Sequence, residues 1–420
     1  MTRPAHIVLA TIGSLGDLHP AIALALELRR RGHQAEIATS GFYREKVSAL
    51  GIGFHALRPE MTVVDETMVR RIMDGRRGSE FLLRDLIFPA VRDSHADLAR
   101  AVAGADLLVA SELIYAAPLL AEKGVVPWVS YSLAPISLFS VFDPPLMPGP
   151  PGTHLLQSLG PAANRFLRAL AKLVSHSWWR PVRDLRRELG LPPTASPFFE
   201  GKYSPRLDLA LFSAVLAPPQ SDWPASTAQC GFPFYDEGSL TIGLPSAVEE
   251  FLSAGEPPIV FTLGSSAVFA ADDFSARSAE AAQILGRRAL LLLGQNPPPA
   301  NLPPSILAWD YLPYAGIFPR AAAIVHQGGV GTTAQALRAG RPMLVMPFAH
   351  DQFDNAARVA RLGVARTIAR RRYTAANAAR QLGPLLTEPR YAQPAASAGA
   401  RVRAERGVDV ACDALERQLH

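Results

Sequence analysis

The stretch from 321 to 355 constrains the fold of this chain more than any other part of the sequence. It opens with an apolar run, 321–325, which predicts a buried strand. His326 and a glycine-rich turn follow, and the spacing of apolar residues over 333–339 predicts a helix that a glycine and a proline end. A second apolar run, 343–348, predicts the next strand. Strand, helix and strand in this order predict an α/β fold with a parallel sheet.

The turn between the first strand and the helix has the chemistry of a phosphate site. Gly328, Gly329 and Gly331 let the backbone approach an anion closely, and the start of the helix presents free N–H groups to it. Thr332 adds a hydroxyl, and His326 can donate a hydrogen bond, more strongly if it is protonated. Glycines alone would fit a tight structural turn equally well. Their combination with the histidine and the threonine favours the phosphate site.

Two polar residues follow the second strand, and their chemistry suits a sugar. Asp351 only accepts hydrogen bonds, whereas Gln352 both donates and accepts them, so the pair matches sugar hydroxyls. Ligands of parallel α/β sheets bind beyond the carboxyl ends of the strands. We therefore expect the phosphate site and this pair to lie at the same edge of one sheet.

The whole stretch resembles the nucleotide-sugar signature of family 1 glycosyltransferases of the GT-B fold, in its bacterial HxGGxGTT form. Within that family the chain resembles most the bacterial branch that holds the rhamnolipid rhamnosyltransferases, with antibiotic and sterol glycosyltransferases further off. The resemblance covers nearly the whole chain. It implies two Rossmann-like parallel-sheet domains that face each other across a cleft. It also implies inverting, metal-independent transfer from a dTDP- or UDP-sugar, with no cofactor.

The N-terminal strand, 6–12, is followed by GSLGDLHP, in which Pro20 suits the first position of a helix. This loop is not GxGxxG, which disfavours a dinucleotide site. It resembles instead the first loop of the same glycosyltransferases. The resemblance implies that Asp17 is the general base, with Gly16 close to the donor and His19 as a rival base. Asp17 equally suits a cap of the following helix, and the two roles can coexist.

Glu112 follows the predicted strand 107–110, where plant members of the family carry an Asp that orients their catalytic His. In this chain Glu112 would face Asp17 rather than a histidine, so that dyad does not transfer. Two nearby carboxylates raise the pKa of one of them, and this would make Asp17 a better base. This remains a hypothesis from the sequence.

The middle of the first half of the chain is apolar, aromatic and rich in proline, and in GT-B enzymes this part forms the acceptor pocket. The expected lining residues are Glu112, Trp128, Tyr131 and Phe139. Such a pocket favours a lipophilic hydroxylated acceptor. The branch resemblance favours a hydroxy-fatty-acid glycolipid, followed by a macrolide or a sterol-like ring system.

The segment 165–187 mixes basic residues with leucines, a phenylalanine and two tryptophans. This composition suits a helix that lies on an anionic membrane surface. It equally suits a helix that covers the domain core and exposes a solvated basic face. Peripheral membrane association therefore stays open.

Two further segments of the second half resemble donor-binding motifs of the family. FTLGSS resembles FTxGS, which implies that Ser265 approaches a phosphate. Tyr311 stands two residues before Pro313, where the family places an aromatic residue that stacks on the nucleotide base, with Leu312 beside it. Trp309 is the alternative stacking residue.

Composition narrows the remaining possibilities. The net charge of +5 comes mostly from dispersed arginines, and no basic–aromatic motif points to nucleic acid. The two cysteines lack metal-ligand spacing, and no signal-peptide pattern or long apolar stretch is present, so we expect a cytoplasmic protein.

The predicted domains are an acceptor domain over 1–216, a proline-rich linker over 217–235 and a donor domain over 236–394. A C-terminal helix over 395–420 is expected to cross back to the first domain. Two other functions fit the same pattern, a GT-B-fold sugar-nucleotide epimerase and a non-catalytic sugar-nucleotide-binding partner subunit.

Overall fold

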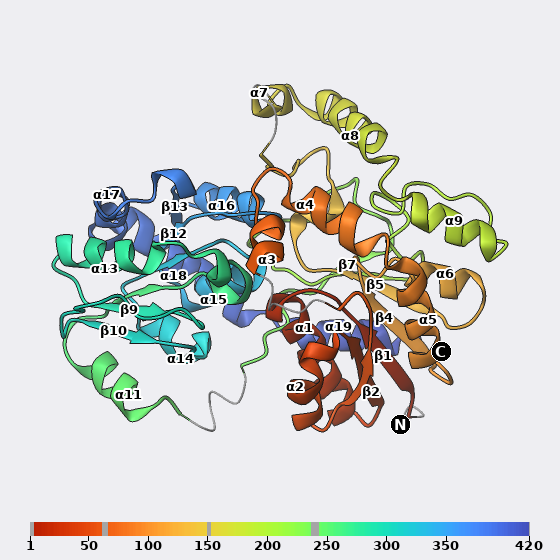
Figure 1. Ribbon diagram of the computed structural model, residues 1–420, viewed down its shortest axis with the longest axis horizontal. Coiled ribbons are helices and arrows are strands. Elements are labelled where there is room, and N and C mark those ends of the chain that lie inside the picture. The colour runs from red at the N-terminus through yellow and green to blue at the C-terminus, as the bar shows by residue number, and fades with distance from the viewer. Residues whose placement is uncertain (1–3, 61–65, 149–152, 237–242, 420) are drawn as a thin grey trace. The chain divides into compact units, whose positions relative to one another are not determined.

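The computed structural model describes residues 4–60, 66–148, 153–236 and 243–419 (Figure 1). The chain forms two compact units, each built on its own parallel sheet. Unit 1 comprises Met1–Val64, Ser79–Tyr235 and Glu405–His420, and unit 2 comprises Asp65–Gly78 and Asp236–Ala404. The prediction of two parallel α/β domains is confirmed.

Unit 1 contains a seven-stranded sheet in the order β3-β2-β1-β4-β5-β6-β7, with every neighbouring pair parallel. Its strands are β1 (His6–Ala10), β2 (Gln34–Thr39), β3 (Gly53–Ala56), β4 (Leu107–Ser111), β5 (Trp128–Ser132), β6 (Asp208–Ala210) and β7 (Thr227–Gln229). The central strands are nearly continuous apolar runs because both faces of the sheet are covered.

The helices of unit 1 cover both faces of this sheet. They are α1 (Leu15–Arg30), η1 (Gly41–Tyr43), α2 (Arg44–Ala49), α4 (Gly78–Glu80), the π-helix η2 (Phe81–Ile87), α5 (Val91–Ala101), α6 (Ala117–Glu122), η3 (Pro135–Leu138), α7 (Thr153–Gln157), α8 (Pro161–Ser175), α9 (Arg180–Glu188) and α19 (Gly407–Glu416). One core cluster joins α1 and α19 to the sheet, and the other joins α5, α6 and α9 to its opposite face.

Helix α1 begins earlier than the sequence predicted. Pro20 lies inside the helix and not at its first position, because Ser14 and Asp17 form a capping box that starts the helix at Leu15. Pro20 is the sixth helical residue, counted from Leu15. The prediction of a helix start at Pro20 was therefore wrong.

The C-terminal segment forms two helices where the sequence predicted one. Helix α18 (Pro389–Ala404) belongs to unit 2, and α19 belongs to unit 1. Helix α19 packs against α1, with Cys412 and Leu415 fully buried between them and the sheet. Arg31, at the end of α1, forms ion pairs with Asp413 at 2.6 Å and with Glu416 at 2.8 Å. These contacts attach the C-terminus to the first unit.

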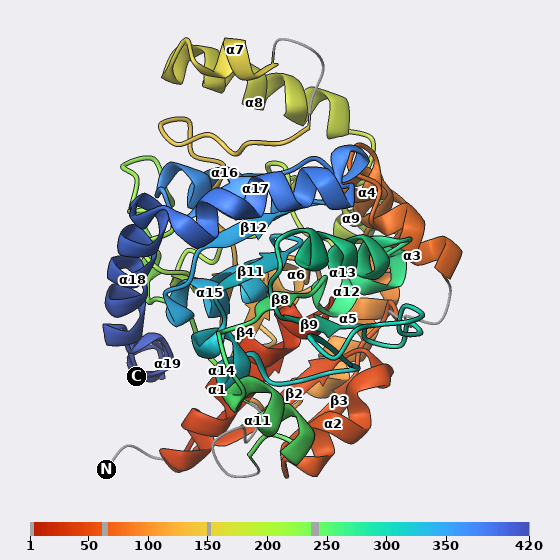
Figure 2. The same ribbon diagram turned by 90° about the vertical axis from the view of Figure 1, so that its left-hand side faces the viewer.

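Unit 2 contains a six-stranded parallel sheet in the order β10-β9-β8-β11-β12-β13. Its strands are β8 (Ile259–Phe261), β9 (Ala289–Leu292), β10 (Ile306–Trp309), β11 (Ala323–His326), β12 (Met343–Val345) and β13 (Ala365–Thr367). Its helices are α3 (Glu66–Ile72), α11 (Ser246–Ser253), α12 (Gly264–Ala267), η4 (Val268–Ala270), α13 (Phe274–Ile284), α14 (Tyr314–Ile317), η5 (Phe318–Arg320), α15 (Val330–Ala339), α16 (Gln352–Arg361), η6 (Arg370–Arg372), α17 (Ala375–Thr387) and α18. Figure 2 shows α15 and α17 beside β11 and β12.

The segment Asp65–Gly78 leaves unit 1 and packs in unit 2, which the sequence did not indicate. Arg70 pairs with Asp272 at 2.9 Å, and the ring of His350 donates a hydrogen bond to the backbone of Ile72. A Cβ on Gly75 would lie only 2.8 Å from the carbonyl oxygen of Phe348. The segment is thus held against the loop that follows β12. Conversely, residues 217–235, the expected linker, pack in unit 1.

Among the residues that the structure describes, no helix combines the length and apolar character needed to cross a bilayer.

Candidate active site

The candidate donor site of unit 2 begins at the turn between β11 and α15. His326 is the last residue of β11, and its side chain is fully buried. Its Nδ1 accepts a hydrogen bond of 3.0 Å from the N–H of Gly328, so the ring proton is on Nε2. Nε2 is buried and has no hydrogen-bond partner within the described ranges. It is therefore a donor that the protein itself does not use.

Burial also decides the charge of this imidazole. Desolvation lowers the pKa of His326 to about 3, because the cation loses more hydration than the neutral ring. His326 is neutral at any pH near 7. The condition for a stronger, protonated donor is therefore not met near pH 7, and the neutral Nε2–H remains as the donor.

The glycines of the turn are required by close packing. Gly328 has φ +92°, and a Cβ there would lie 2.9 Å from the carbonyl oxygen of Gln352 and from a methyl of Val345. A Cβ on Gly329, which precedes α15, would lie 2.9 Å from Nε2 of Gln327. The backbone at the start of α15 is held close to the neighbouring loop, with Gly331 in the first turn of the helix.

Gln327 is a residue whose role the sequence did not suggest. Its amide donates to Oγ1 of Thr332 at 3.4 Å and lies where a Cβ on Gly264 would be, 2.3 Å away. It therefore connects the start of α15 to the start of α12, which carries the half-buried Ser265. The sequence offered one signal for this role, the position of Gln327 between His326 and the paired glycines. Thr332 itself is buried.

The two residues predicted to meet sugar hydroxyls make hydrogen bonds to the protein backbone. Oδ2 of Asp351 accepts from the N–H of Val330 at 3.1 Å and from the side chain of Asn355 at 2.7 Å. Oε1 of Gln352 accepts from the N–H of Phe348 at 2.8 Å. One side-chain oxygen of each residue therefore accepts backbone hydrogen bonds that hold the loops at the carboxyl edge of the sheet. Contact with a sugar remains a prediction for both residues.

The residues predicted at the nucleotide base differ in exposure. Tyr311 follows β10 and is 51% exposed, which leaves its ring accessible for stacking. Leu312 is buried in the core, so the structure does not support direct contact with the donor. Trp309 is half-buried within β10. The structure therefore favours Tyr311 over Trp309.

The candidate acceptor site is in unit 1, where Asp17 caps α1. Its Oδ2 accepts from the N–H of Ser14 at 2.7 Å and from the Ser14 hydroxyl at 3.2 Å. Gly13 has φ +138°, and a Cβ there would lie 2.2 Å from the same oxygen. The predicted capping interaction is confirmed, with Ser14 as the N-cap residue. The role of Asp17 as general base stays a prediction.

The environment of Asp17 raises its pKa to about 6. Burial is the main cause, the hydrogen bonds from Ser14 act in the opposite direction, and the charge of Glu112 adds a smaller increase. Glu112 accepts hydrogen bonds from Ser137 and Lys202, and the lysine compensates its charge. The hypothesis that Glu112 raises the pKa of Asp17 has the right direction, but burial matters more.

The rival base, His19, is partly buried. Its ring meets that of Tyr235 edge-on, with the ring centroids 5.3 Å apart. His19 is two residues beyond Asp17 on the same helix, α1.

The predicted aromatic lining of the acceptor pocket is only partly supported. Trp128 is the first residue of β5 and is buried, so it lies at the opposite sheet edge from Asp17. Tyr131 is fully buried in the core. The structure does not expose either side chain, because a strand in the middle of a parallel sheet is covered on both faces, and contact with an acceptor stays a prediction for both. Phe139 is partly exposed and adopts φ +47°. Its ring packs against that of Phe199, with the ring centroids 4.8 Å apart.

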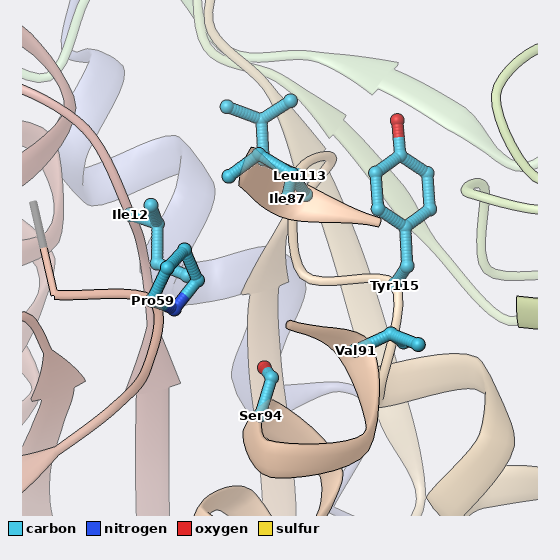
Figure 3. A pocket seen from close by; sticks show the side chains of 7 residues that line it. All are labelled: Ile12, Pro59, Ile87, Val91, Ser94, Leu113 and Tyr115. Carbon is cyan, nitrogen blue, oxygen red and sulfur yellow. The ribbon is translucent and has the colours of Figure 1, made fainter. Parts of the chain in front are cut away.

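The structure contains a small, mostly apolar pocket at the carboxyl edge of the unit 1 sheet (Figure 3). It is lined by Ile12, Pro59, Ile87, Val91, Ser94, Leu113 and Tyr115. Ile12 and Leu113 follow β1 and β4, and Ile87 ends the π-helix, a form often found at functional sites. The hydroxyl of Tyr115 is buried without a hydrogen-bond partner in the described parts of the chain. Neither Trp128 nor any other predicted lining residue belongs to this pocket.

Two parallel α/β units define the class of protein, since one carries a glycine-rich turn with a buried histidine and the other a helix-capping carboxylate, each after the carboxyl end of a strand. Residues 290–409 match the erythromycin biosynthesis protein CIII-like C-terminal domain, and residues 7–137 match the glycosyltransferase family 28 N-terminal domain. The first match lies mostly in unit 2 and the second mostly in unit 1.

Similar proteins agree with this class. The chain is 33% identical over 429 residues to O-mycaminosyltylonolide 6-deoxyallosyltransferase of Streptomyces fradiae, which covers 98% of this chain and 97% of that protein. It is 29% identical over 448 residues to a sterol 3-beta-glucosyltransferase of Neurospora crassa, which covers 100% of this chain and 27% of that longer protein. The chain belongs to the glycosyltransferase family of the Streptomyces enzyme.

Solved structures show the same fold. The glycotransferase of kitacinnamycin matches with a TM-score of 0.75 and 20% identity over 100% of both chains. Spinosyn rhamnosyltransferase SpnG, complexed with thymidine diphosphate, matches with a TM-score of 0.69 and 18% identity over 98% of this chain and 100% of that one. The GT-B fold expected from the sequence is confirmed.

Proposed function

We propose that this protein transfers a sugar from a nucleoside diphosphate sugar to a hydroxyl group of a lipophilic acceptor, with inversion at the anomeric carbon. The observation that carries this proposal is the neutral, buried Nε2–H of His326, which the protein leaves without a partner beside the start of α15. A buried donor next to a helix N-terminus suits a diphosphate oxygen.

The donor is held by groups from four sheet-edge turns of unit 2. The diphosphate meets His326, the backbone at Gly328 and Gly329, and the hydroxyl of Ser265. The base stacks on the exposed ring of Tyr311. The sugar meets the side chains of Asp351 and Gln352. The dTDP nucleotide is favoured over UDP, because a structural relative carries thymidine diphosphate.

In this mechanism Asp17 takes the proton of the acceptor hydroxyl. The oxygen then forms a bond to the anomeric carbon from the face opposite the leaving group, while the bond from that carbon to the diphosphate oxygen breaks. The hydrogen bond from His326 and the N-terminus of α15 stabilise the negative charge that develops on the diphosphate. These groups supply the stabilisation without a metal ion.

The acceptor we propose is a lipophilic ring system that carries a hydroxyl. Apolar side chains such as Ile12 and Leu113 follow strands β1 and β4 at the sheet edge that also carries Asp17, and apolar burial contributes roughly 25 cal/mol for each Å². Two relatives bear names that refer to a tylonolide and to sterols. The resemblance to the rhamnolipid rhamnosyltransferases adds rhamnosyl transfer to a hydroxy-fatty-acid glycolipid as the second possibility.

The test has a donor arm and an acceptor arm. Thermal unfolding is measured with UDP-, dTDP- and GDP-sugars, and we expect one of the first two to raise the Tm most, because a ligand of the folded state stabilises it by mass action. A hydroxylated macrolide or sterol then competes with glycerol for the preferred donor. Higher kcat/KM for glycerol would contradict the lipophilic acceptor, and no stabilisation by any nucleotide sugar would contradict the donor site.

A further inference from the structure

Helix α8 is oriented with its apolar side toward solvent. Phe166 is 63% exposed, Leu173 is 73% exposed and Val174 is 63% exposed, and all three lie on one stripe of the helix. The residues buried on the opposite side, Asn164 and Ser175, are polar. A helix that only covered a domain core would show the opposite arrangement.

Polar contacts with the rest of unit 1 fix this orientation. Nδ2 of Asn164 donates to the carbonyl oxygen of Val141 at 2.9 Å. Lys172 forms an ion pair with Glu200 and lies over the ring of Phe199. The apolar stripe therefore faces outward because the polar side of α8 is attached to its own domain.

The exposed apolar side chains are concentrated in this region. Of the thirteen large hydrophobic residues that are exposed in the described parts of the chain, eight lie between positions 142 and 174. They are Phe142, Leu146, Leu155, Leu159, Phe166, Leu170, Leu173 and Val174. Helices α7 and α8 lie side by side in Figures 1 and 2, away from the sheet of unit 1. We call the exposed apolar residues of the segment 142–174 the α7–α8 face.

The charged residues from 144 to 183 in the sequence are all basic, although Lys172 is paired with Glu200 and Arg180 lies 3.6 Å from Asp184. No Asp or Glu occurs between Asp143 and Asp184, whereas five Lys and Arg residues do. Arg165 is exposed, and the side chain of Arg180 just beyond α8 is 76% exposed. Two copies of the chain that met through the α7–α8 face would bring like charges together, which disfavours self-association.

We propose that the α7–α8 face binds the surface of an anionic lipid bilayer, with α8 parallel to the membrane plane. The apolar stripe would enter the headgroup–acyl boundary, and the arginines at its margins would pair with lipid phosphates. The anionic bilayer offers both an apolar layer and negative charge, which together match this surface. The inference does not depend on the identity of donor or acceptor.

The experiment is flotation of the full-length protein with vesicles of phosphatidylcholine alone and of phosphatidylcholine mixed with phosphatidylglycerol. We expect binding to the mixed vesicles that weakens as salt is added. Leu173→Gln should lower that binding roughly tenfold, because a leucine side chain no longer leaves water. The matched control is Ile284→Gln, since Ile284 is 56% exposed on α13 of unit 2, and this variant should bind like the wild type.

Three results would overturn the proposal. The wild type could fail to bind the mixed vesicles, or Leu173→Gln could bind them as the wild type does. Alternatively, sedimentation without vesicles could show a dimer that Leu173→Gln dissociates, which would assign the face to a second copy. Equal Tm values and equal stabilisation by the preferred nucleotide sugar verify that the variants are folded. They also separate this test from the test of the proposed function.

Discussion

The two units share an architecture but place opposite kinds of titratable group at their sheet edges. In unit 1, burial raises the pKa of Asp17 to about 6, and it raises that of Asp208, within the sheet, to about 6 as well. In unit 2, burial lowers the pKa of His326 to about 3 and that of His350 to about 4. The cause is the same, since burial disfavours the charged form, which is the anion of a carboxyl and the cation of an imidazole.

The opposite pKa shifts imply different chemistry for unit 1 and unit 2. A carboxyl with a pKa near 6 is ionised at neutral pH and is still basic enough to accept a proton. A histidine with a pKa near 3 does not exchange protons at that pH and acts as a fixed hydrogen-bond donor. Proton transfer is thus expected in unit 1 alone, with charge stabilisation in unit 2.

The largest effect should follow from Asp17→Asn. Asn retains an oxygen that can accept from the N–H of Ser14, so the helix start should persist, but the base is lost. General base catalysis contributes roughly 10²–10⁴-fold, and we expect kcat to fall by that factor while the KM for acceptor and the Tm hold. Steady-state kinetics and thermal unfolding measure this. A wild-type kcat in this variant would contradict the assignment of Asp17 as the general base.

Ser14→Ala is the control that distinguishes the base from a capping residue. The Ser14 hydroxyl lowers the pKa of Asp17, so its removal should move the acidic limb of the kcat–pH profile from about pH 6 to higher pH. The lost cap costs about 1 kcal/mol of folding stability. A purely structural Asp17 would show the stability loss without any displacement of the pH profile.

A smaller effect should follow from His326→Ala. Removing a hydrogen bond to a charged diphosphate costs about 1.5–3 kcal/mol, so kcat/KM for the donor should fall roughly 10- to 150-fold. His326→Gln restores a donor group and should recover part of the loss. The pH profile should be unchanged in both variants, because His326 stays neutral. Loss of a limb near pH 6–7 in His326→Gln would show instead that this histidine titrates.

The two halves also differ in how far the sequence predicted them. The donor half lies on one stretch, in which His326, Gly328 and Asp351 follow two strands that pair directly. Local pattern and the rule for parallel sheets were enough to place these residues at one edge. The neutral state of His326 was beyond the sequence, because it depends on complete burial by residues from elsewhere in the unit.

The pocket of unit 1 was not predicted, because it collects residues from distant positions in the sequence. Ile12, Pro59, Ile87 and Leu113 meet only through the order of the sheet and the π-helix. Aromatic content alone selected Trp128 and Tyr131, which the structure places in the core. Composition indicates that a region is apolar, but strand register decides which side chains reach a pocket.

The smallest effect concerns stability in mild acid, where the two units should respond in opposite directions. His326 has a folded pKa of about 3 against an ordinary value near 6.5, so below pH 6.5 the unfolded chain binds a proton that the folded chain does not. The free energy of unfolding therefore falls with pH because of His326, by about 2 kcal/mol between pH 6.5 and 5. Above pH 6.5 His326 causes no such loss. Asp17 and Asp208 have raised pKa values, so unit 1 gains stability from them as the pH falls from 6 toward 4.

Amide hydrogen exchange at pH 7 and pH 5, corrected for the intrinsic rates, should therefore show lower protection of β11 and α15 at pH 5, while the protection of β1 and α1 is retained. His326→Gln should reduce the loss in unit 2. Earlier opening of β1 and α1 would contradict the assigned pKa directions.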